Sequence, residues 1–165
     1  MTTPELSEPV GEGWDLPRPF LIEHAVAKED IDGLGHANNT SYMRWCERVS
    51  WAHSASLGIT LATYRATRRA MVIRRCEYDY LAAAYPEEPL ALATWVVECD
   101  GIIRIVRRFQ IRNARDGRTL LRARTEFACI NLDTGRATRM PQAFADTYSS
   151  VLAQIPDQHV PNRPS

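Results

Sequence analysis

The sequence predicts an α+β fold in which an antiparallel sheet wraps around one long central helix. Residues 40–57 carry apolar side chains at helical spacing, which predicts an amphipathic helix. Four strand-like runs follow it, and Asp-Gly pairs separate two pairs of neighbours, which is a strong signal for antiparallel hairpins. One apolar helix face and one apolar sheet face are both buried only when they pack together, so we expect the sheet to curl around the helix.

The composition indicates a single globular domain. The 165 residues suffice for one substantial core. Prolines near both ends, together with glycines near the N-terminus, predict a flexible N-terminal arm over residues 1–17 and a flexible C-terminal tail over 155–165, with the domain over 18–154. The formal charge of zero disfavours a nucleic-acid partner. Neither a membrane-spanning run nor a secretory signal is recognisable, so no membrane partner and a cytoplasmic location are expected.

The first half of the chain predicts a strand, a loop and the helix. Residues 20–27 alternate in polarity as a strand does, and residues 28–39 form a loop. Asn39 is expected to be the N-cap of the helix, and Gly58 its C-terminal stop. The stripe that should face the sheet consists of Tyr42, Trp45, Cys46, Val49, Ala52, His53 and Ser56.

The second half predicts the sheet and a last helix. The four strands are expected over residues 71–81, 90–99, 102–112 and 119–131. A turn at residues 133–135 leads to a short strand over 136–140. Pro141 is suited to the first turn of a helix that we expect to run through residue 153.

The most informative stretch is residues 32–42, which read DGLGHANNTSY. It places a carboxylate ahead of a helix start. The carboxylate can attack a carbonyl carbon or activate water, while free N–H groups of the first helical turn hold the developing oxyanion. The residues also fit a simpler interpretation, an Asx-rich loop with a helix cap.

This order of residues, followed by a helix and a strand meander, resembles the hotdog-fold acyl-CoA thioesterases, and among them the 4-hydroxybenzoyl-CoA thioesterase-like family. The resemblance covers residues 20–152, and the segments 129–135 and 140–141 are also similar to the family's last strands. It implies hydrolysis of an acyl-CoA to a free acid and CoA, with no cofactor, since CoA is part of the substrate. It also implies a homodimer or homotetramer in which two subunits join their sheets around the active site.

The resemblance also implies residue roles. The family's catalytic acid corresponds to Asp32, and its conserved glycine and histidine correspond to Gly35 and His36. The backbone N–H that faces the thioester carbonyl corresponds to that of Asn39, and the helix tyrosine corresponds to Tyr42. Substrate-binding positions are therefore expected at Gly35, Asn38 and Tyr42, and catalytic ones at Asp32, His36 and Asn39.

Several roles stay open on the sequence. Asp32 acts as nucleophile or as general base, and His36 and Asn38 hold the loop or touch the substrate. Asp30, in the same loop, is expected to be exposed. Glu47 is expected on the wrong helix face for catalysis. Leu34 stands where acyl-carrier-protein thioesterases of this fold have asparagine, which disfavours a carrier-protein substrate.

The remaining polar residues indicate structural roles. The four cysteines are too far apart to predict a metal site or a redox pair, so free thiols and no metal are expected. Arginines gather on one sheet face, where nearby acids or the phosphates of CoA are expected to neutralise them. They are Arg104, Arg108, Arg112, Arg122 and Arg124, and the candidate acids are Glu77, Asp79, Glu98 and Glu126.

Two other functions remain as alternatives. A hotdog hydroxyacyl dehydratase resembles a different motif, a His-Pro pair with an acid on the long helix, and no proline follows His36. A non-catalytic acyl-CoA-binding protein needs the cavity but not Asp32, so the acid favours the enzyme.

Overall fold

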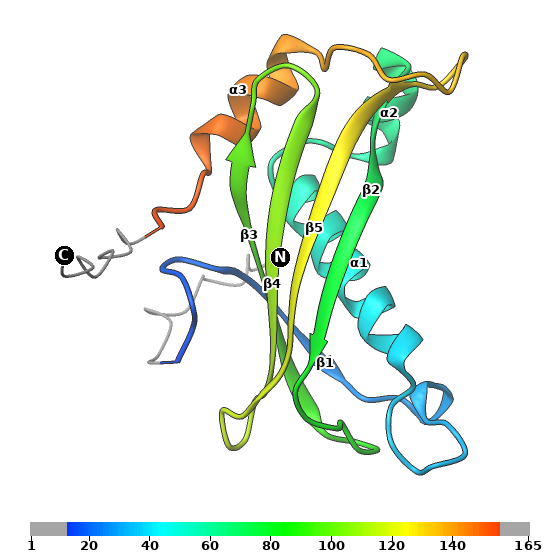
Figure 1. Cartoon of the computed structure of the whole chain (residues 1–165), viewed down its shortest axis with the longest axis vertical. Coiled ribbons are helices and arrows are strands. Elements are labelled where there is room, and N and C mark those ends of the chain that lie inside the picture. Colours follow the sequence, from blue (N-terminus) through cyan, green and yellow to red (C-terminus); the bar gives the residue numbers. More distant parts are fainter. Residues whose placement is uncertain (1–12, 156–165) are drawn as a thin grey trace, which may run out of the picture.

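The computed structural model describes residues 13–155 of the chain. A five-stranded antiparallel sheet has the order β1-β3-β4-β5-β2, and the long helix α1 lies along one of its faces (Figure 1). The predicted α+β fold, with a sheet wrapped around one long helix, is confirmed. The elements are β1 (Phe20–Ala25), the 3-10 turn η1 (Lys28–Asp30), α1 (Asn39–Ser56), α2 (Leu61–Thr67), β2 (Arg69–Tyr80), β3 (Pro89–Cys99), β4 (Arg104–Asn113), β5 (Thr119–Asn131) and α3 (Gln142–Ser150).

The two Asp-Gly turns form the hairpins that the sequence predicts. In the β3–β4 turn, the Asp100 carboxylate accepts the backbone N–H groups of Ile102, Ile103 and Arg104, and Gly101 has a φ of +69°. In the β4–β5 turn, Gly117 has a φ of +73°. Glycine adopts this left-handed backbone without the steric cost that a Cβ atom brings. The turns therefore fix the register of the three central strands.

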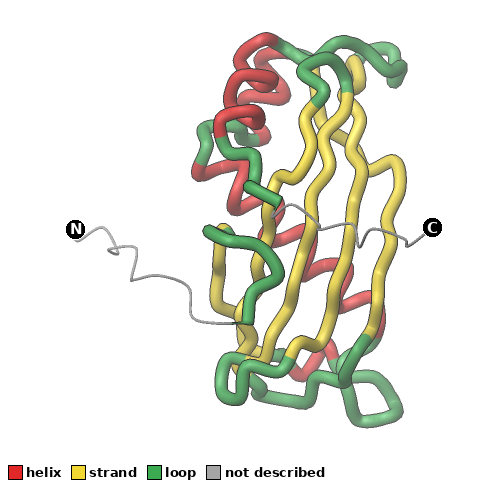
Figure 2. Tube along the Cα trace, turned by 60° about the vertical axis from the view of Figure 1, so that its left-hand side comes forward, coloured by secondary structure: helices red, strands yellow, loops and turns green. Residues whose placement is uncertain are grey.

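The main core lies between α1 and the concave face of the sheet. Figure 2 shows α1 behind the strands and running along them. Val49 of α1, Leu92 of β3 and Ile111 of β4 are all fully buried there. This packing buries the apolar stripe of the helix, which stabilises the fold by removing apolar area from water. Among residues 13–155, no helix has the length and apolar character needed to cross a bilayer.

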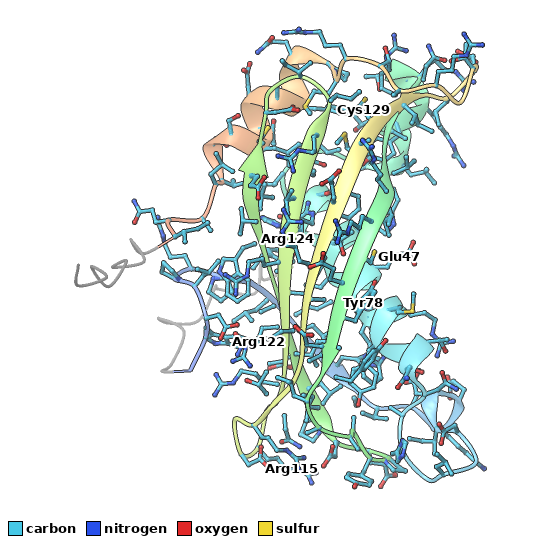
Figure 3. All side chains as sticks on the ribbon, in the orientation of Figure 1. Glu47, Tyr78, Arg115, Arg122, Arg124 and Cys129 are labelled. Atoms are coloured by element: carbon cyan, nitrogen blue, oxygen red, sulfur yellow. The ribbon has the colours of Figure 1, made fainter. Side chains whose placement is uncertain are left out.

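The convex face carries the arginines, and acids neutralise them. Figure 3 shows Arg122 and Arg124 on the face opposite α1. Arg124 contacts Glu98 at 3.0 Å, and Arg104 contacts both Glu98 and Glu126. The expectation that nearby acids neutralise these arginines is therefore confirmed for Arg104 and Arg124.

Residues 13–17, which the sequence assigns to the N-terminal arm, pack on this convex face. Asp15 contacts Arg122 at 2.6 Å, a partner that the sequence did not indicate. Trp14 lies edge-on against Trp95 with ring centroids 6.3 Å apart, and Leu16 is buried. The rest of the expected arm, residues 1–12, and the tail from residue 156 lie outside the described residues.

Most strand ends differ from the prediction by one or two residues, and four other departures are informative. The N-cap of α1 is Asn38 rather than Asn39. The segment expected to form a strand over 136–140 pairs with β5 at one isolated bridge alone, between Ile130 and Ala137. The last helix ends at Ser150 rather than at residue 153. The short helix α2, whose first turn is capped by the Thr60 side chain, was missed because its sequence is too short to show a periodic apolar pattern.

Candidate active site

The loop before α1 folds back on itself as a miniature hairpin. The amide of Asp32 donates to the carbonyl of His36 at 3.0 Å, and the amide of Asn38 donates to the carbonyl of Asp30 at 2.8 Å. Gly35 has a φ of +84° in the turn, a conformation that glycine adopts readily. The hairpin therefore places Asp32 directly opposite His36, next to the start of α1.

The carboxylate of Asp32 has one engaged oxygen. Its Oδ1 accepts the backbone N–H of Leu34 at 2.8 Å, which is the Asx-turn role that the sequence left open. Within residues 13–155, its Oδ2 accepts no hydrogen bond. The side chain is half-buried. One oxygen thus holds the loop, while the other is available to a substrate or a water molecule.

The first turn of α1 leaves one amide open. The Asn38 side chain accepts the backbone N–H of Thr40 at 2.9 Å and the Thr40 hydroxyl at 2.8 Å. The N–H of Asn39 has no acceptor within the part of the chain that the structure describes. The first N–H groups of a helix have no partner inside the helix. The Asn39 amide is therefore a free donor at the positive end of the helix dipole.

Asp30 anchors this loop, which corrects the expectation that it is exposed. Only 5% of its surface is accessible, and its carboxylate contacts Arg44 of α1 at 2.7 Å and the Ala27 amide at 3.0 Å. Burial alone would raise the pKa of the Asp30 carboxyl, but hydrogen bonds from Ala27, Ser41 and Arg44 outweigh it and hold the pKa below its usual value. Asp30 is thus an ionised structural acid that ties the loop to the helix.

The two aromatic residues nearest the helix start are fixed by hydrogen bonds. The Tyr42 hydroxyl accepts the Ala84 amide at 2.9 Å and donates to the Ala82 carbonyl at 3.3 Å, and its ring is buried in the core. Tyr80 of β2 donates to the Asn39 carbonyl at 3.3 Å, a contact that the sequence did not indicate. His36 is half-buried, and its Nδ1 lies 3.5 Å from the Ala37 carbonyl.

A cavity of about 290 Å³ lies between α1 and the concave faces of β2, β4 and β5. It begins at Met43, one helical turn after Asn39, and continues along α1 to Ser54. None of the catalytic or substrate-binding residues expected from the sequence lines it. Its lining consists of Met43, Cys46, Glu47, Ser50, Trp51, Ser54, Tyr64, Met71, Val72, Ile73, Tyr78, Ile105, Arg107, Phe109, Thr125, Phe127 and Tyr148.

Glu47 is the single carboxylate in this lining, which corrects the expectation that it lies on the wrong helix face. Its side chain is exposed, and Figure 3 shows it on α1 alongside the edge strand β2. The surface of α1 that faces the sheet and the cavity is wider than the sequence pattern indicated, because the sheet curves around α1 toward β2. Glu47 is therefore a second acid near the candidate site.

The far end of the cavity holds a buried polar cluster that the sequence analysis missed. Arg107 of β4 is 1% exposed and donates to the Ser54 hydroxyl at 2.9 Å and to Nδ1 of His53 at 2.8 Å. Its guanidinium carbon lies 5.7 Å from the ring centroid of Tyr148. Strand alternation contains a signal for it, because Arg107 shares its face with Ile105 and Phe109, both of which are buried.

Comparisons with known proteins agree with this architecture. The family model of the Thioesterase-like superfamily matches residues 26–148. Among curated proteins, none matches the chain in sequence. A 1,4-dihydroxy-2-naphthoyl-CoA thioesterase from Synechocystis is 20% identical with a TM-score of 0.72, and the alignment covers 80% of this chain and 96% of that one.

Two solved structures from Staphylococcus aureus are also similar. A DHNA-CoA thioesterase is 22% identical with a TM-score of 0.73, covering 80% of this chain and 89% of that one. A hypothetical protein determined in complex with CoA is 17% identical with a TM-score of 0.76, covering 88% and 92% of the two chains. At these identities the likeness shows the fold, and the predicted hotdog fold is confirmed.

Proposed function

Because this chain belongs to the Thioesterase-like superfamily, we propose that it is an acyl-CoA thioesterase that hydrolyses an acyl-CoA to a free carboxylic acid and CoA. The observation that carries the proposal is the free N–H of Asn39 at the start of α1, beside the Asp32 loop and one turn from the cavity. A thioester carbonyl that accepts this N–H has room for its acyl group along the same helix. The relative determined with CoA supports a CoA-type ligand.

Asp32 supplies the reacting carboxylate in this proposal. It attacks the thioester carbonyl and expels the CoA thiolate, which gives a mixed anhydride that water then hydrolyses, or it removes a proton from a water molecule that attacks the carbonyl and expels the thiolate. Both routes place negative charge on the carbonyl oxygen, and the Asn39 amide stabilises it. The loss of one such donor typically costs about 3 kcal/mol of transition-state stabilisation. Gly35 and His36 keep the loop in the conformation that presents Asp32.

We also propose that two copies pair through the edge strand β2. Within the described residues, β2 pairs on one side alone, with β5. Its Ile73 is 52% exposed and Tyr80 is 42% exposed. An unpaired edge of this length with exposed apolar side chains is an aggregation hazard unless another chain covers it. Pairing there forms a homodimer and places the cavity and Glu47 at the boundary between its subunits. Two such dimers form a homotetramer.

Thiol release from a panel of acyl-CoAs tests the proposed activity. The wild-type protein should release CoA from at least one member, and Asp32→Asn should abolish most of this release while still binding the same acyl-CoA. Asp133→Asn is a matched control, because Asp133 is an exposed acid that pairs with Arg68 at the end of α2 and not with the loop that holds Asp32. Equal binding by both proteins with no thiol release would instead establish an acyl-CoA-binding protein. Loss of water from a 3-hydroxyacyl-CoA would establish a dehydratase.

A further inference from the structure

Arg107 is a buried cation that has no anionic partner among the described residues. It is 1% exposed, and within residues 13–155 no carboxylate lies within ion-pair distance of its guanidinium. Charges are seldom buried in proteins unless they are paired, because removing a charge from water is costly. The arginines of the convex face, such as Arg104 and Arg122, follow this rule and contact acids. Arg107 therefore differs from its neighbours on the same sheet.

The groups around Arg107 are neutral hydrogen-bond partners. Burial, and then the nearby Arg107 charge, lower the pKa of His53 to about 4, so that its ring is neutral at pH 7 and accepts from Arg107. Ser54 contributes a hydroxyl oxygen, and burial raises the pKa of the Tyr64 hydroxyl, so Tyr64 also stays neutral. These contacts orient the guanidinium but bring no negatively charged side chain to it.

The end of α1 compensates this charge in part. His53 and Ser54 lie in the last turn of the helix, where the dipole places about half a negative charge on the free carbonyls. However, the amides of Leu57, Gly58 and Ile59 and the Ser56 hydroxyl already donate to the carbonyls of this turn. The helix end thus favours a cation at this position but does not replace an anion.

Arg107 also lines the cavity, which begins at Met43, one helical turn beyond the proposed thioester site, and continues along α1. From the charge, the burial and this position, we infer that the cavity takes an acyl group whose far end carries a carboxylate, and that Arg107 binds this carboxylate. The inference rests on the proposed function. A guanidinium matches a carboxylate with two parallel hydrogen bonds, and the apolar walls formed by Met71, Ile105 and Phe109 suit the chain between the two ends.

The geometry sets the length of this acyl group. Ser54 follows Asn39 by fifteen residues, which corresponds to about 22 Å along the helix. One hydrogen bond of about 3 Å at each end leaves about 16 Å, the span of an extended chain of about twelve carbons. The acyl group should therefore be the half-thioester of a medium or long dicarboxylic acid.

Specificity constants for matched pairs of substrates test the inference. Each pair contains the CoA half-thioester of a dicarboxylic acid of eight to fourteen carbons and the methyl-ended acyl-CoA of the same length. The wild-type protein should favour the carboxylate by about 10- to 100-fold near twelve carbons. Arg107→Met should remove this preference, and Arg107→Lys should keep part of it. Arg108→Met is the matched control, because Arg108 is on the opposite face of β4 and contacts Asp15, so the preference should persist.

Equal or better hydrolysis of the methyl-ended member of every pair would overturn the inference while leaving the thioesterase intact. A second measurement does not depend on catalysis. Thermal unfolding with decanoate, compared with 1-decanol at the same concentration, should show a larger rise in Tm for decanoate with the wild type but not with Arg107→Met. If 1-decanol raises the Tm of the wild type as much as decanoate does, the inference is wrong, whether or not any acyl-CoA is hydrolysed.

Discussion

The two ends of α1 present opposite kinds of polar site. At its first turn, a loop of consecutive residues holds Asp32 half-buried, and the amide of Asn39 is free. At its last turn, Arg107, His53 and Tyr148 come from three separate elements and are almost fully buried. In the function proposed above, the open end of α1, at its first turn, carries out the chemistry, and the closed end, at its last turn, selects the acyl group.

The largest effect should come from the acids at the open end. Asp32→Asn should lower kcat by about 1,000-fold, because it removes the nucleophile or general base. Glu47 is the rival acid, because it lines the cavity. Its substitution Glu47→Gln should lower kcat by less than about tenfold. Steady-state thiol release under saturating acyl-CoA measures both. A larger loss for the Glu47 variant would show that the reacting acid is on α1 and not in the loop, which would contradict the proposed roles of the two ends.

The closed end, through His53, should make the free energy of unfolding depend on pH. The unfolded chain binds a proton at His53 below its usual pKa of 6.5, whereas in the folded protein burial and Arg107 lower the pKa of His53 to about 4. Stability should therefore fall as the pH decreases from 6.5 to 4, by about 3 kcal/mol from this group.

Urea unfolding at pH 7.5, 5.5 and 4.5 measures this loss. His53→Asn keeps an acceptor near Nδ1 but does not titrate, so its stability should fall less over the same interval. Acids such as Asp30 and Glu98, whose pKa values lie below their usual range, contribute equally to both proteins. Parallel curves for the two proteins would show that His53 is not the titrating group.

Within the open end, Asp30 and Asp32 should separate into a structural and a chemical acid. Asp30→Ala should lower the free energy of unfolding by about 2 kcal/mol, because the Ala27 amide and Arg44 lose a charged acceptor. Asp32→Asn should cost less than about 1 kcal/mol, since it affects a single exposed hydrogen bond. Urea unfolding at pH 7.5 compares them, and equal losses would contradict the separation.

The smallest effect distinguishes the two asparagines at the helix start. Asn38→Ala should cost about 1 kcal/mol of stability, because it removes the cap on Thr40. Asn39→Ala should change stability by less than about 0.5 kcal/mol and should leave thiol release nearly intact, because the backbone amide remains. A severe loss of activity in Asn39→Ala would mean that the side chain, and not the amide, contacts the substrate.

The sequence predicted what depends on local order along the chain. Helix spacing and the Asp-Gly turns predicted α1 and the central hairpins, and the run from Asp32 to Tyr42 located the loop ahead of the helix. The N-cap was wrong by one residue because Asn38 and Asn39 are adjacent and both are good caps. The burial of Asp30 depends on Arg44, fourteen residues later, and no local pattern predicts such a pairing.

The closed end was missed because it is assembled across the fold. Arg107 contacts His53, which is 54 residues away in the sequence, and the Tyr148 ring of α3 packs against the Arg107 guanidinium. The arginines noted from the sequence are those of the convex face, and Arg107 alternates with them on the opposite face of β4. The position of Glu47 likewise follows from the curvature of the sheet, which the sequence does not specify residue by residue.

The most direct test is a crystal structure with an acyl-CoA analogue in which a ketone replaces the thioester. The ketone oxygen should accept the Asn39 N–H at about 2.7–3.1 Å. The Asp32 carboxylate, or a water bound to it, should lie within about 3.5 Å of the carbonyl carbon. A ketone held against Glu47, with Asp32 directed away from it and bonded to Leu34 alone, would contradict the proposed roles of Asp32 and Asn39.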